Sequence, residues 1–182
     1  MRPTALAAAL MAAVAPAAFA PAAFAHVTLD PPQAAAGAYL RATLRVPHGC
    51  AGAATERIAL RLPETILAAR PMPKPGWRLT ITRRALEVPV PNGHGGTITE
   101  AVSEITWEGG PLPDEQYDEF TVMLRTPEAP GTTLHLPVIQ GCGGGATAAW
   151  VAIPAAGQHP AAGTLPAPTL RLLPAPPHAG HH

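Results

Sequence analysis

From residue 26 onward, the chain breaks into short apolar or alternating runs that are separated by proline and glycine. Residues 39–46 and 119–125 alternate hydrophobic and polar side chains with a period of two, which is typical of a strand with one buried and one solvated face. Turn-forming residues predict loops at 91–96 and 109–114. The predicted strands are residues 27–29, 39–46, 57–62, 78–83, 101–107, 119–125, 132–140 and 150–153.

This spacing of about eight short strands, with little helical periodicity, predicts an all-β fold. The expected architecture is a β-sandwich of the immunoglobulin or cupredoxin type. Residues 169–173 are a candidate for a last strand. No internal repeat interrupts this pattern, so we expect a single domain.

Residues 1–25 have the pattern of a secretory signal, with a short positive start, an alanine-rich run and two small-x-small sites at 18–20 and 23–25. Pro21 disfavours cleavage at the first site, because its fixed φ resists the extended conformation that a protease needs. Cleavage at the second site exposes His26 as a free N-terminus. An uncleaved anchor is the alternative, although prolines interrupt the apolar run and leave it too short for a membrane span.

The expected organisation is a signal peptide at 1–25, a domain at 26–174 and a disordered, histidine-containing tail at 175–182. Such a protein is periplasmic or otherwise extracytoplasmic, with no transmembrane segment after signal removal. The 12 basic and 12 acidic side chains balance. Because Lys and Arg are scattered and not clustered, a nucleic-acid partner is not expected.

Cys50 and Cys142 are the two cysteines of the chain. An even number of cysteines in an exported protein favours one disulfide. The loop that such a bridge closes is long, so the bridge would stabilise the fold by roughly 4 kcal/mol because it constrains the unfolded chain. The bridge would hold the segment around His48 against the turn at 140–142.

Several sequence blocks follow one another in the order of a known family. They are His26-Val27-Thr28, residues 45–50, residues 73–77, residues 109–120, residues 131–142, and Trp150 with Ile153-Pro154. Each block alone is a weak signal, but together they resemble the YcnI-like copper-binding domain family. The likeness extends from His26 to about residue 174.

This resemblance implies an exported β-sandwich that binds Cu(II) through its N-terminal histidine. The family site is a single-histidine brace, with a carboxylate as a further ligand and a tryptophan near the metal. By position, His26 matches the brace histidine and Trp150 the tryptophan. The family carboxylate follows a Val-Pro pair, but here Val46 and Pro47 are followed by His48. The resemblance therefore leaves the further ligand open.

The chemistry of His26 suits copper. Its α-amine and Nδ1 close a chelate ring with a metal, and the amine has an unperturbed pKa near 8, so Cu(II) displaces its proton at neutral pH. Nitrogen donors favour Cu(II) among the divalent first-row metals. In the precursor the nitrogen of residue 26 belongs to a peptide bond, so cleavage creates the site.

We expect His48 to replace the missing carboxylate, because imidazole is a good nitrogen donor; the alternative is a surface histidine. Asp118 or Glu119 is a second candidate, unless these carboxylates only line the rim. Cys50 and Cys142 offer a different possibility, as soft Cu(I) ligands in place of a disulfide.

Trp150 would shield the metal, although it could equally be a core tryptophan, as we expect of Trp77 and Trp107. The histidines of the tail could collect metal only loosely. His94, His135 and His159 show no ligand spacing.

The sequence favours a copper carrier or chaperone over an enzyme, because no arrangement of nucleophile, base and orienting group is visible. A copper-dependent oxidase or oxygenase that uses the same site is one alternative, and a β-sandwich interaction module without metal is another. The expected partners are the copper ion and other periplasmic or membrane copper-handling proteins.

Overall fold

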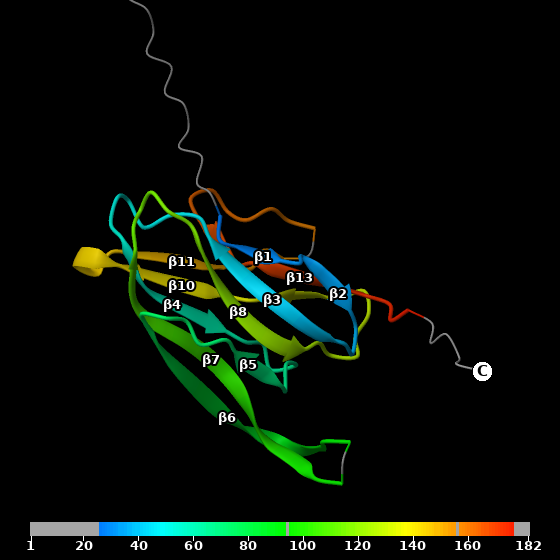
Figure 1. The fold of residues 1–182 in the computed structure, drawn as a ribbon. Helices are drawn as coiled ribbons and strands as arrows, with labels where there is room; N and C mark the ends of the chain where they lie inside the picture. Colours follow the sequence, from blue (N-terminus) through cyan, green and yellow to red (C-terminus); the bar gives the residue numbers. More distant parts are fainter. Residues whose placement is uncertain (1–25, 94, 156, 177–182) are drawn as a thin grey trace, which may run out of the picture.

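The computed structural model describes residues 26–176 except residues 94 and 156 (Figure 1). The predicted signal peptide and the last six residues of the predicted tail lie outside this part of the chain. The described residues form strands and one short 3₁₀ turn, Gly143–Gly145. The strands are β1 Thr28–Asp30, β2 Gln33–Ala35, β3 Tyr39–Val46, β4 Thr55–Arg61, β5 Ala69–Pro71, β6 Trp77–Pro91, β7 Thr97–Leu112, β8 Asp118–Arg125, β9 Thr133–His135, β10 Val138–Cys142, β11 Thr147–Ala152, β12 Leu165–Pro166 and β13 Thr169–Leu173.

These strands form the predicted β-sandwich. One sheet has the order β1-β3-β8-β5, and the second has the order β12-β11-β10-β4-β7-β6. A small third sheet, β2-β13-β9, contains the last strand that the sequence predicted. The strands that the sequence missed are β2, β5 and β12, which have two or three residues each and are too short to show a periodicity.

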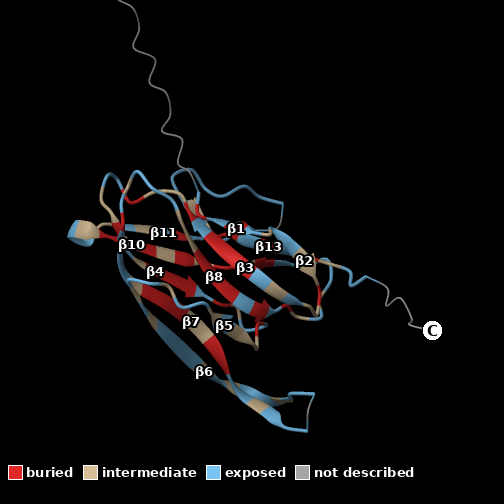
Figure 2. Cartoon of the chain, viewed as in Figure 1, coloured by how far each residue is buried: buried red, intermediate tan, exposed pale blue. Residues whose placement is uncertain are grey.

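The core lies between the two larger sheets, and it follows the alternation seen in the sequence (Figure 2). On β3 the side chains of Leu44 and Val46 are fully buried, while Arg45 between them is exposed. Phe120 on β8 is buried against this layer, and Trp107 on β7 is buried from the opposite sheet. Burial of these large apolar side chains is the main stabilising contribution to such a fold.

The two loops that the sequence predicted at 91–96 and 109–114 differ in the structure. The loop expected at 91–96 is present, since the Asn92 N–H donates to the Gly96 carbonyl at 2.9 Å and joins β6 to β7. The loop expected at 109–114 is present only from Pro113 onward, because β7 continues through Gly109 and Gly110 to Leu112. Gly110 has a φ of 83°, and a Cβ there would come within 2.6 Å of the Trp77 ring. Glycine at this place therefore permits close packing within a strand.

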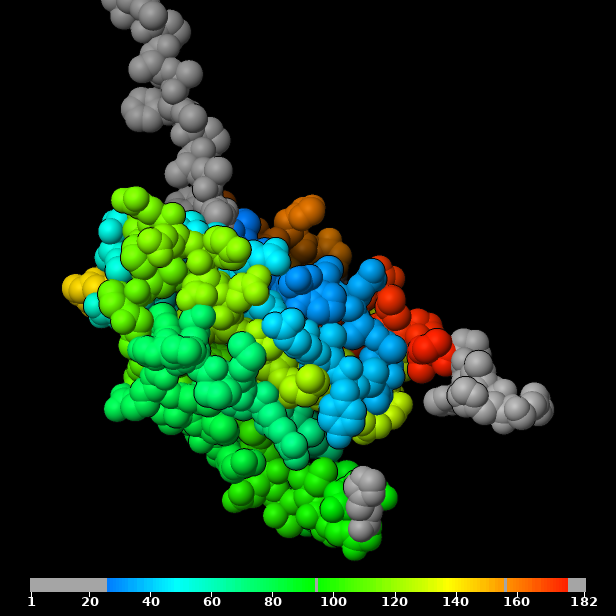
Figure 3. All heavy atoms as spheres, viewed as in Figure 1, coloured from blue at the N-terminus to red at the C-terminus, as the bar shows by residue number. Residues whose placement is uncertain are grey.

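The β6–β7 hairpin extends well beyond the rest of the sandwich (Figure 1). The opposite end of the molecule carries the connections at 47–54 and 113–117 (Figure 3). Within the described residues, no helix has the length and apolar character needed to span a membrane.

Candidate metal centre

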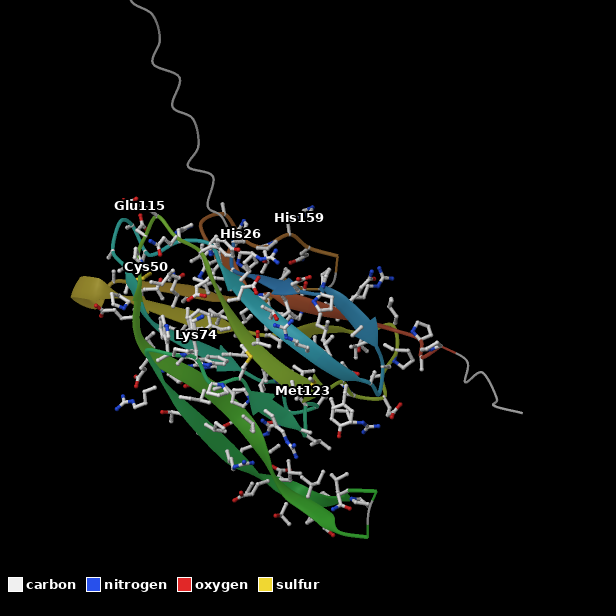
Figure 4. All side chains as sticks on the ribbon, viewed as in Figure 1. His26, Cys50, Lys74, Glu115, Met123 and His159 are labelled. Carbon is white, nitrogen blue, oxygen red and sulfur yellow. A yellow bond between two sulfur atoms is a disulfide. The ribbon has the colours of Figure 1, made fainter. Side chains whose placement is uncertain are left out.

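The register of the first sheet brings the candidate residues to one end of the sandwich. Thr28 on β1 pairs with Arg45 on β3, so continuing this antiparallel register places His26 across from Pro47. His48 follows directly. Val46 at the end of β3 pairs with Asp118 at the start of β8, which brings the 113–117 connection to the same end. His26, Cys50 and Glu115 lie at this end in Figure 4.

His26 and Trp150 are in contact. Their ring centroids lie 5.5 Å apart, and the rings meet edge to face at 74°. His26 is exposed, whereas Trp150 is 2% exposed. Because β1 and β11 belong to different sheets, this contact bridges the sandwich at its end. The two residues that the resemblance singled out, 124 positions apart by subtraction of their numbers, thus meet in the fold.

Trp150 is held by Gln140, a residue that the sequence analysis did not single out. The indole Nε1–H of Trp150 donates to the Gln140 Oε1 at 3.2 Å. The Gln140 Nε2 group donates to the His48 carbonyl at 2.7 Å and to the Thr55 Oγ1 at 2.8 Å. Gln140 is 1% exposed, so its amide is satisfied by protein groups in the interior.

The His48 ring has one nitrogen engaged and one available. Its Nδ1 lies 2.6 Å from the Gly49 carbonyl oxygen. A carbonyl oxygen only accepts hydrogen bonds, so Nδ1 carries the proton, and in the neutral ring Nε2 then has the free lone pair. A histidine that ligates a metal commonly donates its other ring N–H to a backbone carbonyl in this way. In the described structure His48 connects to Trp150 through Gln140, and no ring contact joins His48 to His26.

The predicted disulfide is present between Cys50 and Cys142, whose Cα atoms lie 5.9 Å apart. It ties the 47–54 connection to the end of β10, as the sequence analysis anticipated. The Cys142 Sγ lies 3.8 Å from the Thr55 Oγ1, beside the Gln140 amide. With both sulfurs in the bridge, the described residues contain no free thiol for Cu(I).

The carboxylates that the sequence suggested as ligands are occupied by cations. Asp118 accepts from the Lys74 ammonium at 2.7 Å. Glu119 lies 3.4 Å from the Arg45 guanidinium. To ligate a metal, either carboxylate would have to leave its cation, which makes both weaker candidates than they are by sequence position alone.

Asp114 is a carboxylate that the sequence reasoning missed. A Cβ on the buried Gly49 would come within 2.9 Å of the Asp114 Oδ1, so this carboxylate lies against the connection that carries His48. Among the described residues Asp114 has no cation partner. Its position in the 113–117 connection gave no local signal, because proximity to Gly49 depends on the pairing of β3 with β8.

No cluster of three or more His, Cys, Asp and Glu side chains suited to a metal occurs in the described part of the chain. A brace differs from such a cluster, because one N-terminal histidine supplies two of the donors. His94 and the tail histidines His178, His181 and His182 lie outside the described residues.

The two packed sheets and the bridged end define an immunoglobulin-like β-sandwich protein. A solved structure of an uncharacterized protein from Nocardia farcinica with an immunoglobulin-like fold is similar over 81% of this chain and 98% of that one, with 34% identity and a TM-score of 0.62. The chain belongs to the family described as "Domain of unknown function (DUF1775)", whose model matches residues 26–172. This is the YcnI-like family that the sequence resembles. No curated protein matches the chain significantly.

Proposed function

We propose that this is an exported copper-binding protein that carries Cu(II) on the N-terminal His26 of the processed chain. The contact between the exposed His26 ring and the buried Trp150 supports this most directly. An N-terminal histidine without a function has no need of a fixed neighbour. Here its ring rests on a tryptophan that the core holds in place.

The donor set fits a cupric ion. The α-amine and Nδ1 of His26 form the brace, and the Nε2 of His48 is a third nitrogen donor in this proposal. Asp114, which lies beside Gly49 and has no cation partner among the described residues, is the acid donor in this proposal. Trp150 covers one side of His26 and limits the approach of water and other ligands.

A carrier suits this arrangement better than an enzyme. One chelating residue with few further ligands holds copper and also lets a partner remove it. The proposed location is the periplasm or another extracytoplasmic space, and the proposed partners are copper-handling proteins there. A copper oxidase or oxygenase with the same ligands is the second candidate, favoured by His48 as a second imidazole. Hydrogen peroxide formation by the reduced copper protein would support the enzyme.

The decisive test is a Cu(II) titration followed by electron spin resonance, which counts the nitrogen donors. Protein that begins at His26 is compared with protein that carries one additional N-terminal alanine. We expect one tight site with nitrogen donors in the first protein and loss of that site in the second, because the added residue turns the amine into an amide. Equal tight binding by both would exclude the brace.

The further ligands are tested by His48→Ala and Asp114→Asn in protein that begins at His26. We expect His48→Ala to weaken Cu(II) binding at least about tenfold and to remove one nitrogen from the spin-resonance signal. Asp114→Asn should weaken binding less and keep all nitrogen donors. His135→Ala, on β9 of the small third sheet, is the matched histidine control. Unchanged affinity and spectrum in His48→Ala would remove His48 from the ligand set.

A further inference from the structure

The side-chain amide of Gln140 has its orientation determined by its neighbours. An indole N–H only donates, so the oxygen of the amide must face Trp150. A backbone carbonyl only accepts, so the nitrogen must face His48. Both amide hydrogens are used, since the second is donated to Thr55. Rotation of the amide by 180° would break the bonds to Trp150 and to the His48 carbonyl, so these two partners determine one orientation.

The partners of Gln140 come from separate parts of the chain. Trp150 is on β11, Thr55 begins β4, and His48 precedes the disulfide in the connection at 47–54. Gln140 is 92 residues from His48 in sequence. The amide thus connects the tryptophan beneath His26 to the backbone of His48 across the interior of the sandwich.

Trp107 shows that a buried indole in this fold does not need a side-chain acceptor. Its Nε1–H donates to the backbone carbonyl of Met72 at 3.1 Å. An indole N–H can therefore be satisfied by a backbone carbonyl alone, without a polar side chain such as that of Gln140. What Gln140 adds is the second bond, to His48.

We propose that Gln140 is the positioning residue of the copper site, which rests on the function proposed above. It sets the place of the Trp150 ring, and through that ring the place of His26, relative to the His48 backbone. It is not a ligand, because its amide is fully engaged in the interior. Its loss should disorder the His26 side chain and release the His48 carbonyl from its hydrogen bond, while the disulfide still holds the 47–54 connection in place.

The first measurement uses the unsubstituted, metal-free protein that begins at His26. Proton magnetic resonance should show a Trp150 indole N–H that exchanges slowly with solvent, because it is buried and bonded to Gln140. The ring protons of His26 should be displaced from the positions of a free histidine by the ring current of Trp150. An indole proton that exchanges as fast as an exposed one would overturn the proposal without any variant.

The second measurement uses Gln140→Met, which keeps the length and shape of the side chain but makes none of the three bonds. Thr55→Val is the matched control, because it removes a partner of Gln140 and leaves the bonds to Trp150 and His48. We expect Gln140→Met to move the His26 ring protons toward free histidine and to weaken Cu(II) binding about tenfold or more. Gln140→Asn, with the same chemistry, should restore part of the His26 displacement. Thr55→Val should change neither measurement appreciably.

The two readouts separate this proposal from the function on which it rests. Unchanged His26 ring shifts and copper affinity in Gln140→Met would overturn the positioning by Gln140, even where the unsubstituted protein binds copper tightly. Altered ring shifts in a protein that never binds copper would overturn the copper function and support the positioning. If Gln140→Met does not fold, the proposal is tested by the exchange rate of the Trp150 indole proton in the unsubstituted protein, and fast exchange would overturn it.

Discussion

The two buried tryptophans Trp107 and Trp150 lie in regions of the molecule that differ in what the indole ring contacts. Trp107 is fully buried, and its ring packs edge to face on Phe120 at 5.5 Å. Trp150 is almost as deeply buried, but its aromatic neighbour is the exposed His26. The same residue type at the same depth therefore supports the core in one region and a surface group in the other. Burial alone does not distinguish them, whereas the neighbour of the ring does.

The surroundings of the two rings differ in the same way. Phe120 also contacts the Trp77 ring at 4.9 Å and lies below the Lys74 ammonium at 5.1 Å, so the Trp107 region is an aromatic cluster. The Trp150 region is a polar network around Gln140 beside a disulfide. Apolar contacts of the first kind tolerate small shifts, whereas hydrogen bonds of the second kind require particular distances and angles. Such directional bonds hold the groups around a binding site in fixed positions.

The largest expected effects come from removal of either ring. Trp107→Ala and Trp150→Ala should each lower the free energy of unfolding by about 3–5 kcal/mol, because each leaves a large cavity. Only Trp150→Ala should also shift the His26 ring protons and weaken copper binding. Urea unfolding and proton magnetic resonance of both variants test this difference. A shift of His26 by Trp107→Ala as large as that by Trp150→Ala would refute the division into two regions.

The next effect in size concerns the disulfide. Replacing Cys50 and Cys142 together by serine should lower the free energy of unfolding by about 2–4 kcal/mol, because the unfolded chain is no longer constrained. Without the bridge, the 47–54 connection that carries His48 is no longer held to β10, so copper binding should also weaken in the metal titration. Fluorescence of the Trp107 region should remain that of the folded protein at low urea. If copper affinity is unchanged in the folded double variant, the bridge serves stability alone.

The smallest effect is expected on the outer face of the Trp107 region. The hydrogen bond from Arg78, with the charges of Arg78 and Arg57, holds the pKa of Glu108 below its usual value of 4.5. A lowered pKa stabilises the fold at neutral pH, and this contribution is lost as the pH falls through the folded-state value, below 4.5. Solvent screens these exposed charges, so Glu108→Gln should barely change unfolding at pH 7. Urea unfolding from neutral to acidic pH should show a slightly flatter dependence in the variant; a large loss at pH 7 would contradict this.

The strands with a clear alternation were predictable from sequence. The range 39–46 agrees with β3, and 119–125 agrees with β8 apart from Asp118. The predicted strand at 132–140 is instead two strands, β9 and β10, with Pro137 between them. Pro137 has no N–H, so no hydrogen bond of a strand ladder can be donated at this position. The error at Gly109 and Gly110 has a different cause, because a glycine pair reads as a turn unless the approach of Trp77 is known.

Some residues of the candidate site were found from the sequence, and others only from the structure. His26 and Trp150 were chosen through the resemblance; the structure places their rings in contact, and their roles at a metal stay predictions. His48 was chosen from its place after Val46 and Pro47, and its role as a ligand stays a prediction. Gln140 and Asp114 were not found, because a buried glutamine on a strand and an aspartate in a turn look ordinary until their neighbours are known.

The sequence by itself determined the sandwich class, the family and the pairing of the two cysteines, and it predicted His26 as the mature N-terminus. These properties follow from periodicity, residue number and the order of short motifs, which are all local or countable. Only the tertiary structure decided that Trp150 lies under His26 and that Gln140 joins it to His48. The reason is physical: Trp150 and Gln140 lie on the neighbouring strands β11 and β10, whereas His26 and His48 lie just outside β1 and β3 of the other sheet. Packing of the two sheets brings together groups that no local pattern relates.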